Sequence, residues 1–199
     1  MPTREWLCID FTRTRGWEAR DRTADELEDF GGLGAWAEDH GVLSSDAGAS
    51  MRRAAAQAPA EASRAFRQAV DFRRGLYAVL RAAAEGAEPR PADLAIVNAS
   101  LAEAGAHRVL GHRTDGLTWE WSPHATPLTR VLWPIALSAA ELLTGEEARR
   151  LKFCAADDCG WIFVDRSRNA SRRWCDMADC GNRAKVRRYR ERQRTSDSG

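Results

Sequence analysis

Apolar side chains recur at helical spacing through the long middle of the chain. Residues 45–85 are rich in alanine and arginine, and their pattern predicts helix on both sides of Pro59. The apolar stripe of the second of these helices comprises Phe66, Val70, Tyr77 and Leu80. A further helix is expected from Pro91, which suits a first helical turn, to a stop at Gly105.

Two more helices are predicted with less regular patterns. Residues 127–145 are apolar on nearly every side of a helix, which is typical of a central core helix, and Pro134 predicts a kink or a restart in it. Nearer the N-terminus, Thr23 is expected to cap a helix that carries Leu27, Phe30, Leu33 and Trp36. That helix contains three glycines, Gly31, Gly32 and Gly34. They predict a break in the helix or two short helical pieces.

Two segments have the composition of β-structure. The run "EWLCIDF" at residues 5–11 predicts a short strand, because Trp, Ile and Phe favour a pleated, buried surface. In "HRVLGHRTDGLTWEWSP" the helical spacing of apolar residues is replaced by alternation of apolar and polar residues on either side of an Asp115-Gly116 turn. This pattern predicts a β-hairpin. Its apolar positions are Val109, Leu110, Leu117, Trp119 and Trp121. The expected fold class is therefore mainly α with a small β element (α+β).

Length and composition suit one well-filled domain with a small appendage. The chain has 199 residues, 44% of them hydrophobic. It contains no run of about 18 apolar residues, and the start "MPTREWLCIDFTRTR" lacks the apolar region of a secretory signal. We therefore expect a cytoplasmic protein that does not bind membranes.

Charge is distributed unevenly along the chain. The whole protein carries a net charge of only +1, but residues 1–148 hold 16 arginines and 22 acids, whereas residues 149–194 hold 14 basic residues and 6 acids. A basic module is thus attached to an acidic body. This asymmetry is typical of a nucleic-acid-binding appendage.

Four of the five cysteines lie within the basic module as two pairs. Cys154 and Cys159 are separated by four residues, as are Cys175 and Cys180, and fifteen residues lie between the pairs. Four thiolates in two short-range pairs suit one structural zinc ion held tetrahedrally. A single iron or an iron–sulfur cluster is the competing metal, and disulfides are disfavoured by a reducing cytosol. Cys8 lies in an apolar run and is expected to be a small buried hydrophobe.

The segment after Cys180 predicts a basic helix, because "GNRAKVRRYRERQR" has no proline and no glycine beyond its first residue. Val186 and Tyr189 are expected to anchor one side of it to the metal module. Its arginines recur at spacings of three and four, and "SRNASRR" supplies a second basic cluster. The nucleic-acid-binding residues predicted from these two segments are Arg168, Arg172, Arg173, Arg183, Lys185, Arg187, Arg188, Arg190 and Arg194.

The C-terminal residues also resemble a known family. The stretch "DCGWIFVDRSRNASRRWCDMADCGNRAKVRRYR" is similar to the CGNR zinc finger, named for the sequence that stands here at residues 180–183. The preceding body, with "LCIDF", "WAEDHGVLS" and "PIALSAAELLTG", resembles the ABATE domain. That domain precedes this finger in bacterial proteins described as proposed stress-induced transcription regulators.

The resemblance implies a domain organisation and a function. It implies an ABATE-like domain at residues 1–147 and a DNA-binding CGNR zinc finger at 148–194, with the four paired cysteines as its zinc ligands. The last residues, 195–199, are expected to form a disordered tail. We further expect a bacterial regulator that binds double-stranded DNA at the nucleoid and whose body senses a small-molecule effector or forms a homodimer. One departure from the family is Arg13-Thr14, where an Asn-Thr pair is expected after "LCIDF".

Other functions stay open at this stage. The alternative to DNA binding is an RNA- or protein-binding module, in which Trp161 and Trp174 either stack on unpaired bases or, as is commoner, pack in the core. The body contains four histidines suited to acid–base chemistry, but they lack a recognisable catalytic spacing, and they are His40, His107, His112 and His124. The ligand-binding residues of an effector pocket are not identifiable from the sequence; Trp119, Trp121 and Trp133 are candidates for its lining, with core packing as their default role.

Overall fold

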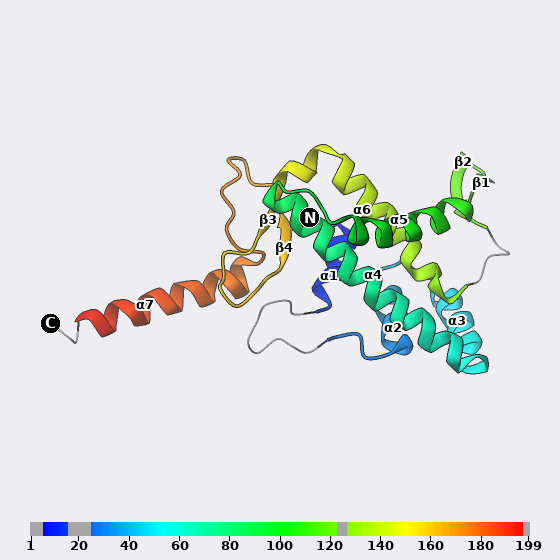
Figure 1. Cartoon of the computed structure of the whole chain (residues 1–199), viewed down its shortest axis with the longest axis horizontal. Coiled ribbons are helices and arrows are strands. Elements are labelled where there is room, and N and C mark those ends of the chain that lie inside the picture. Colours follow the sequence, from blue (N-terminus) through cyan, green and yellow to red (C-terminus); the bar gives the residue numbers. More distant parts are fainter. Residues whose placement is uncertain (1–5, 16–24, 123–126, 197–199) are drawn as a thin grey trace.

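The structure is a computed structural model that describes residues 6–15, 25–122 and 127–196. Within these ranges the chain is mainly helical (Figure 1) and carries two small antiparallel sheets. The α-helices are α1 (Leu7–Arg13), α2 (Phe30–Asp39), α3 (Ser45–Gln57), α4 (Pro59–Glu85), α5 (Pro91–Ala106), α6 (Leu132–Thr144) and α7 (Asn182–Ser196). The strands are β1 (Arg108–Arg113), β2 (Gly116–Trp121), β3 (Leu151–Phe153) and β4 (Ile162–Val164). The predicted fold class is confirmed.

Helix α4 is the element around which the body is built. It begins with Pro59 at its first turn and ends at Gly86, whose φ of +66° closes the helix in the left-handed conformation. Its buried face, which includes Phe72 and Leu76, contacts α1, α2, α3, α5 and α6. Helix α6 is also buried, as expected, but it packs mainly against α5 and α1, whereas α4 contacts all of the other helices of the body.

Two predicted breaks in the helices have simple explanations. Pro59 separates α3 from α4 as predicted, because its ring and missing N–H are tolerated only at a helix start. Pro134 lies in the first turn of α6, and the chain enters that turn through the short helix η1 (Leu128–Val131). The restart therefore precedes Pro134, and α6 ends at Gly145 as expected.

The N-terminal segment was predicted as a strand, and this prediction is wrong. Residues 7–13 form α1, and Cys8, Ile9, Phe11 and Thr12 are buried at the i, i+1, i+3, i+4 spacing of a helix face. Phe11 packs against Trp36 and Phe72, with ring centroids 5.1 and 6.1 Å away. Burial of this face against α4 and α6 outweighs the β-propensity of the individual residues.

The predicted glycine break is also absent from α2. The helix runs unbroken from Phe30 to Asp39 and is capped by Asp29, whose carboxylate accepts a bond of 2.8 Å from the Gly32 N–H. Gly34 is buried, and a side-chain Cβ there would lie 3.4 Å from the terminal methyl group of Met51 in α3. Thr23, the predicted cap, lies outside the described residues.

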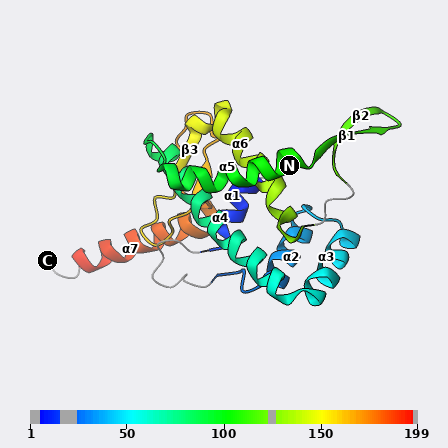
Figure 2. The same cartoon turned by 45° about the vertical axis from the view of Figure 1, so that its right-hand side comes forward.

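The β-hairpin is confirmed, with β1 and β2 paired antiparallel from Arg108–Trp121 to Arg113–Gly116. It projects from one end of the body, whereas α7 extends from the opposite end (Figures 1 and 2). The second sheet, β3–β4, belongs to the cysteine module. Three of its side chains, Leu151, Ile162 and Val164, are part of the same hydrophobic core as the helices, so the module packs directly on the body.

Candidate metal centre and basic helix

The four paired cysteines come together at one point. Cys154 follows β3, Cys159 precedes β4, Cys175 ends the loop after β4, and Cys180 lies in the short helix η3 (Met177–Gly181). Their Sγ atoms all lie within 4.8 Å of one another, and all four residues are buried. The Cys159–Cys175 and Cys175–Cys180 Sγ distances are both 3.6 Å.

These distances fit a tetrahedral zinc ion. Zn–S bonds of about 2.3 Å place the sulfurs of a tetrahedron about 3.8 Å apart. Without a cation, four crowded thiols cannot all ionise: the Cys154 thiolate accepts from Cys159 and Cys175, which lowers the Cys154 pKa and raises the pKa of Cys159 to about 12. A divalent ion removes this conflict by stabilising every thiolate together.

Local backbone structure holds the ligands in position. The Cys154 N–H donates to the Trp161 carbonyl at 2.9 Å, which ties the first ligand to the start of β4. The turn between them uses Gly160 at a φ of +67°, a conformation that side chains rarely adopt. Phe163 points into the module and is fully buried beside the cysteines. Strand β4 therefore covers the metal centre.

The second ligand pair is held by a capped turn. The Asp176 carboxylate accepts from the Ala178 N–H at 2.6 Å and so begins η3. The Asn182 side chain donates to the Ala178 carbonyl at 2.9 Å, where the turn joins α7. A side chain at Gly181 would lie 3.1 Å from the Met177 sulfur, so this position is tightly packed. Cys180 is thereby fixed where α7 starts.

Arg183 contacts the metal centre directly. Its Nη2 lies 3.0 Å from the Cys180 Sγ, and its other nitrogens pair with Asp158 at 3.1 Å and with Asp179 at 3.2 Å. Hydrogen bonds of this kind orient metal ligands and tune their basicity. The sequence suggested a nucleic-acid contact at this position, but the side chain lies against a ligand sulfur and two carboxylates.

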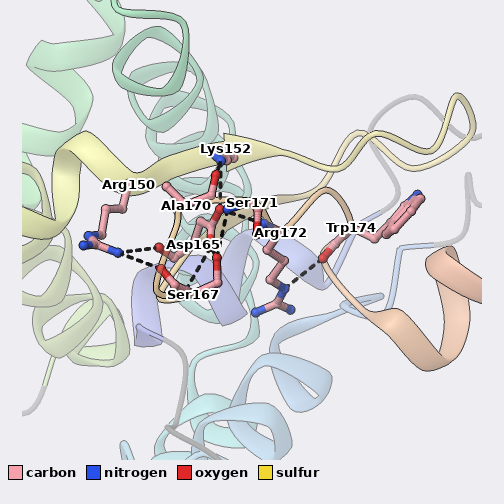
Figure 3. Close-up of polar contacts among 8 residues, drawn as sticks. All are labelled: Arg150, Lys152, Asp165, Ser167, Ala170, Ser171, Arg172 and Trp174. Atoms are coloured by element: carbon pink, nitrogen blue, oxygen red, sulfur yellow. Dashed lines mark hydrogen bonds and ion pairs between the residues drawn. The ribbon is translucent and has the colours of Figure 1, made fainter.

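A second network fixes the loop between the ligand pairs (Figure 3). Its centre is Asp165, which is fully buried and accepts from Lys152 at 2.8 Å, from the Ser167 backbone N–H at 3.0 Å and from the Arg172 N–H at 3.0 Å. Burial opposes ionisation of the carboxyl, but the bonds from Lys152 and Ser167 outweigh it and lower the pKa of Asp165. Arg150 donates to the Asp165 and Ser167 carbonyls at 3.1 and 3.3 Å.

Arg172 is also part of this scaffold. Its guanidinium donates to the backbone carbonyls of Trp174, at 2.9 Å, and Cys175, and it lies over the Phe163 ring. Arg172 therefore helps to hold Cys175, the third of the four ligands, in position. The sequence placed Arg172 and Arg183 among the predicted nucleic-acid-binding residues, because it does not distinguish a carbonyl-bound arginine from a solvated one.

The other predicted basic residues lie on the surface. Arg168 and Arg173 are exposed in the loop, and the exposed basic residues of α7 in the predicted set are Lys185, Arg187, Arg188, Arg190 and Arg194. Arg187, Arg190 and Arg194 share one face of α7, where they line a shallow hollow of about 650 Å³ together with Val186. On another face, Arg173 and Arg188 lie over the half-buried Trp174 ring, 5.3 and 5.9 Å from its centroid.

The predicted anchors of α7 are wrong. Val186 and Tyr189 are 48% and 58% exposed, whereas Ala184 is buried. Ala184 and Arg183 hold the first turn of α7 against the module, and the next turn adds contacts of exposed side chains, from Arg187 to Asp157 and from Arg188 to the Trp174 ring. The rest of the helix projects away from the body (Figure 1).

The metal module is joined to the body by several long-range contacts. The Tyr77 hydroxyl of α4 donates to the Gly160 carbonyl at 2.8 Å, and the Trp161 indole donates to the Arg15 carbonyl at 3.2 Å. Arg13 donates to the Ile162 carbonyl at 3.0 Å. The arginine that departs from the expected Asn-Thr pair thus contacts β4. Trp161 lies at this joint, so the structure supports its core role.

The Glu147 carboxylate, near the C-terminal end of the body, binds both a residue at the N-terminal end of the body and a residue of the metal module. It accepts from the Trp6 indole at 2.6 Å and from two Arg166 nitrogens at 2.6 and 2.8 Å. The bond from Arg166 lowers the pKa of Glu147. This residue was not singled out from the sequence, because its two contacts come from residues far away in the chain.

The remaining candidates in the body do not form a common site. His40 stacks on Trp36, His107 stacks on the buried Trp133, and His112 is exposed on β1, while His124 lies outside the described residues. Among the described residues, the four cysteines are the one group of His, Cys, Asp and Glu side chains with metal-binding geometry. Cys8 is fully buried, and burial raises its pKa to about 12, as expected of an inert thiol.

The three tryptophans proposed for an effector pocket are only partly together. Trp119 and Trp121 line a hollow of about 230 Å³ between the hairpin and α6. Trp133 is buried beneath it, with its ring centroid 5.2 Å from that of Trp121. Arg108 lies over both of the lining rings, so the aromatic faces already have a cation against them.

Comparison with known families agrees with this geometry. The ABATE family model, described as "Putative stress-induced transcription regulator", matches residues 5–146. The CGNR zinc finger model matches residues 150–193, which contain all four clustered cysteines. No curated protein sequence matches the chain. The ligand set, its geometry and the family match together assign one structural zinc ion to Cys154, Cys159, Cys175 and Cys180.

Proposed function

Because the chain belongs to the ABATE family and ends in a CGNR zinc finger, we propose that it is a transcription regulator that binds double-stranded DNA through α7. The zinc ion acts as a structural element that holds the start of the helix. Four thiolates fill its coordination sphere, so the site is suited to folding and not to catalysis.

The observation that carries this proposal is the exposure of α7. Of its 15 residues, seven are arginine or lysine and one is acidic. A helix of this length spans about 22 Å, and the major groove, about 12 Å wide, admits one α-helix. A highly charged helix without tertiary support is marginally stable alone, so neutralisation by phosphates would stabilise it.

Two exposed groups of basic residues supply the contacts. Arg187, Arg190 and Arg194 form the face that enters the groove, while Arg173 and Arg188 beside Trp174 grip the adjacent backbone. Arg168 and Lys185 extend the same surface. Arg187 pairs with Asp157 at 3.0 Å, but both side chains are exposed, so a phosphate replaces this carboxylate at little cost. Arg172 and Arg183 act as scaffold.

Salt dependence tests the proposal. Binding of the zinc-loaded chain to a fluorescent duplex is measured by anisotropy over a series of salt concentrations. Arg190→Ala is expected to weaken binding and to reduce the slope of log K against log salt by about one, since each phosphate contact contributes about 0.9. The matched control is Arg74→Ala, which removes an exposed arginine from α4 and leaves both values unchanged.

The same experiment distinguishes DNA binding from the main alternative, which is binding to single-stranded RNA. Trp174, half-buried between two arginines, favours stacking on unpaired bases. A single-stranded RNA of equal length is therefore titrated at the same salt concentrations. Tighter binding to the RNA, abolished by Trp174→Ala, would replace the DNA proposal, and failure to bind either nucleic acid would end both.

We further propose that the body regulates the finger, in a bacterial cytoplasm and at the nucleoid when DNA is bound. The shared core and the Tyr77–Gly160 bond support this, because a change in α4 reaches the metal centre through packed side chains. None of the helices in the described ranges is long and apolar enough to cross a membrane. The signal, whether an effector or self-association, enters through the body and not through an enzymatic reaction.

A further inference from the structure

The β1–β2 hairpin carries the most exposed large apolar side chains in the described part of the chain. Leu117 is 71% exposed, Leu110 is 61% exposed and Trp119 is 59% exposed. The register places Leu110 opposite Trp119, and Leu117 lies two residues from Trp119, so all three share one face of the ribbon. The same register also places Arg108 and His112 on this face, so the three apolar side chains form a strip that these two β1 residues flank.

The outer edge of β2 is also unprotected. Among the described residues the sheet has only two strands, so one edge of β2 pairs with no other strand. Soluble proteins usually block such edges with charges or proline. β2 carries one charge, Glu120, and its carboxylate is held by Arg113 of β1 at 3.1 Å. A two-stranded ribbon is marginally stable by itself, and additional strands stabilise it.

We propose that this edge pairs with β2 of a second copy of the chain, antiparallel and centred on Thr118. In this register Leu117 lies opposite Trp119 of the second copy, and Trp119 lies opposite its Leu117. The two most exposed side chains of β2 thereby form two cross-strand apolar pairs, which stabilise sheets. The product is a four-stranded sheet in the order β1-β2-β2-β1.

Charge favours a second copy over other occupants. The self-paired register sets Glu120 opposite Gly116, so no like charges meet across the edge. The edge of β1 would instead bring together two sets of Arg108, His112 and Arg113. The hairpin as a whole, residues 108–121, holds two arginines and two acids, so it lacks the basic excess that nucleic-acid binding requires.

The position of the hairpin is compatible with this assembly. It lies at the opposite end of the molecule from α7 (Figures 1 and 2), so pairing leaves both basic helices exposed at the outer ends of the dimer. The inference does not rest on DNA binding, and it is tested without nucleic acid.

Sedimentation of the zinc-loaded full chain across the micromolar range is expected to show a monomer–dimer equilibrium. Leu117→Glu and Trp119→Lys are each expected to weaken dimerisation about tenfold or more, since each removes both apolar pairs. An equimolar mixture of the two variants regains dimer, because the introduced carboxylate of one chain then lies opposite the introduced ammonium of the other, and one native Leu–Trp pair remains. This complementation is specific to the Thr118-centred register.

The control is Leu94→Glu, which places the same charge on an exposed leucine of α5 and leaves dimerisation unchanged. Zinc content and circular dichroism verify that each variant is folded. A wild-type chain that stays monomeric, a Leu117→Glu chain that dimerises like the wild type, or a variant mixture that stays monomeric would each overturn the proposal.

Discussion

The Nη2 atom of Arg183 lies 3.0 Å from the Sγ of Cys180, so the last residue of the CGNR sequence binds the ligand that begins it. The same guanidinium reaches Asp158, which lies between the two cysteines of the first ligand pair. Arg183 therefore clamps the start of α7 to both halves of the metal centre. Arg187, one turn later, also reaches this segment, at Asp157, but through an ion pair of two exposed side chains.

Replacing Arg183 is expected to affect zinc more than nucleic acid. Arg183→Ala removes a hydrogen bond to a ligand sulfur, and losses of this kind lower metal affinity about 10- to 100-fold. Competition with a chromophoric zinc chelator measures the effect. Arg183→Lys should recover part of the affinity, and Arg190→Ala should leave it unchanged. Equal zinc affinities in the Arg183→Ala and Arg190→Ala chains would contradict the clamp.

Tyr77 is expected to couple the body to the finger. Tyr77→Phe leaves the buried Gly160 carbonyl without its donor, and the free energy of unfolding should fall by about 1 kcal/mol. Urea unfolding of the zinc-loaded chain measures this difference. Tyr189→Phe removes an exposed hydroxyl from α7 and serves as the control, with a change within about 0.5 kcal/mol.

Asp165 is expected to be the most sensitive position in the loop between the ligand pairs. Asp165→Asn removes the partner of Lys152 and weakens several hydrogen bonds at a fully buried site, so the free energy of unfolding should fall by about 2 kcal/mol. Asp157→Asn, at an exposed carboxylate in the same module, should change it little. Equal stabilities of these two variants would show that the network has no structural role.

Zinc removal is expected to destabilise the body as well as the finger. Leu151, Ile162 and Val164 belong to the common core, so loss of the metal loosens packing around α4. Chelation should reduce the helical circular dichroism of α7 and lower the melting temperature of the remaining helices by about 2 to 4 °C per kcal/mol lost. Added zinc should restore both. If chelation leaves the melting temperature of the body unchanged, the two parts fold independently.

Cys8 gives the chain a defined response to alkaline pH. Its pKa is about 12 in the folded chain because burial disfavours the thiolate, and about 9 when unfolded. The folded state thus holds this proton more tightly, and the associated stability is complete below pH 9 and lost as pH rises toward 12. Relative to Cys8→Ala, the wild type should lose about 1.4 kcal/mol per pH unit above 9. Parallel stability curves for the two chains would contradict this.

The sequence by itself determined the elements whose information is local. The helices on both sides of Pro59, the helix after Pro91 and the hairpin follow from periodicity and turn residues close together in the chain. The four zinc ligands were also predictable, because their spacing and the CGNR sequence are one-dimensional features.

Only the tertiary structure decided what depends on distant neighbours. Residues 7–13 form a helix because α4 and α6 bury one helical face of this segment. The β-propensity of residues 7–13 does not indicate a helix. Arg172 and Arg183 became scaffold because carbonyls, carboxylates and a sulfur converge on them from several segments. Identical guanidinium groups on one chain differ in role when their surroundings differ in burial and in hydrogen-bond acceptors, and folding alone sets those surroundings.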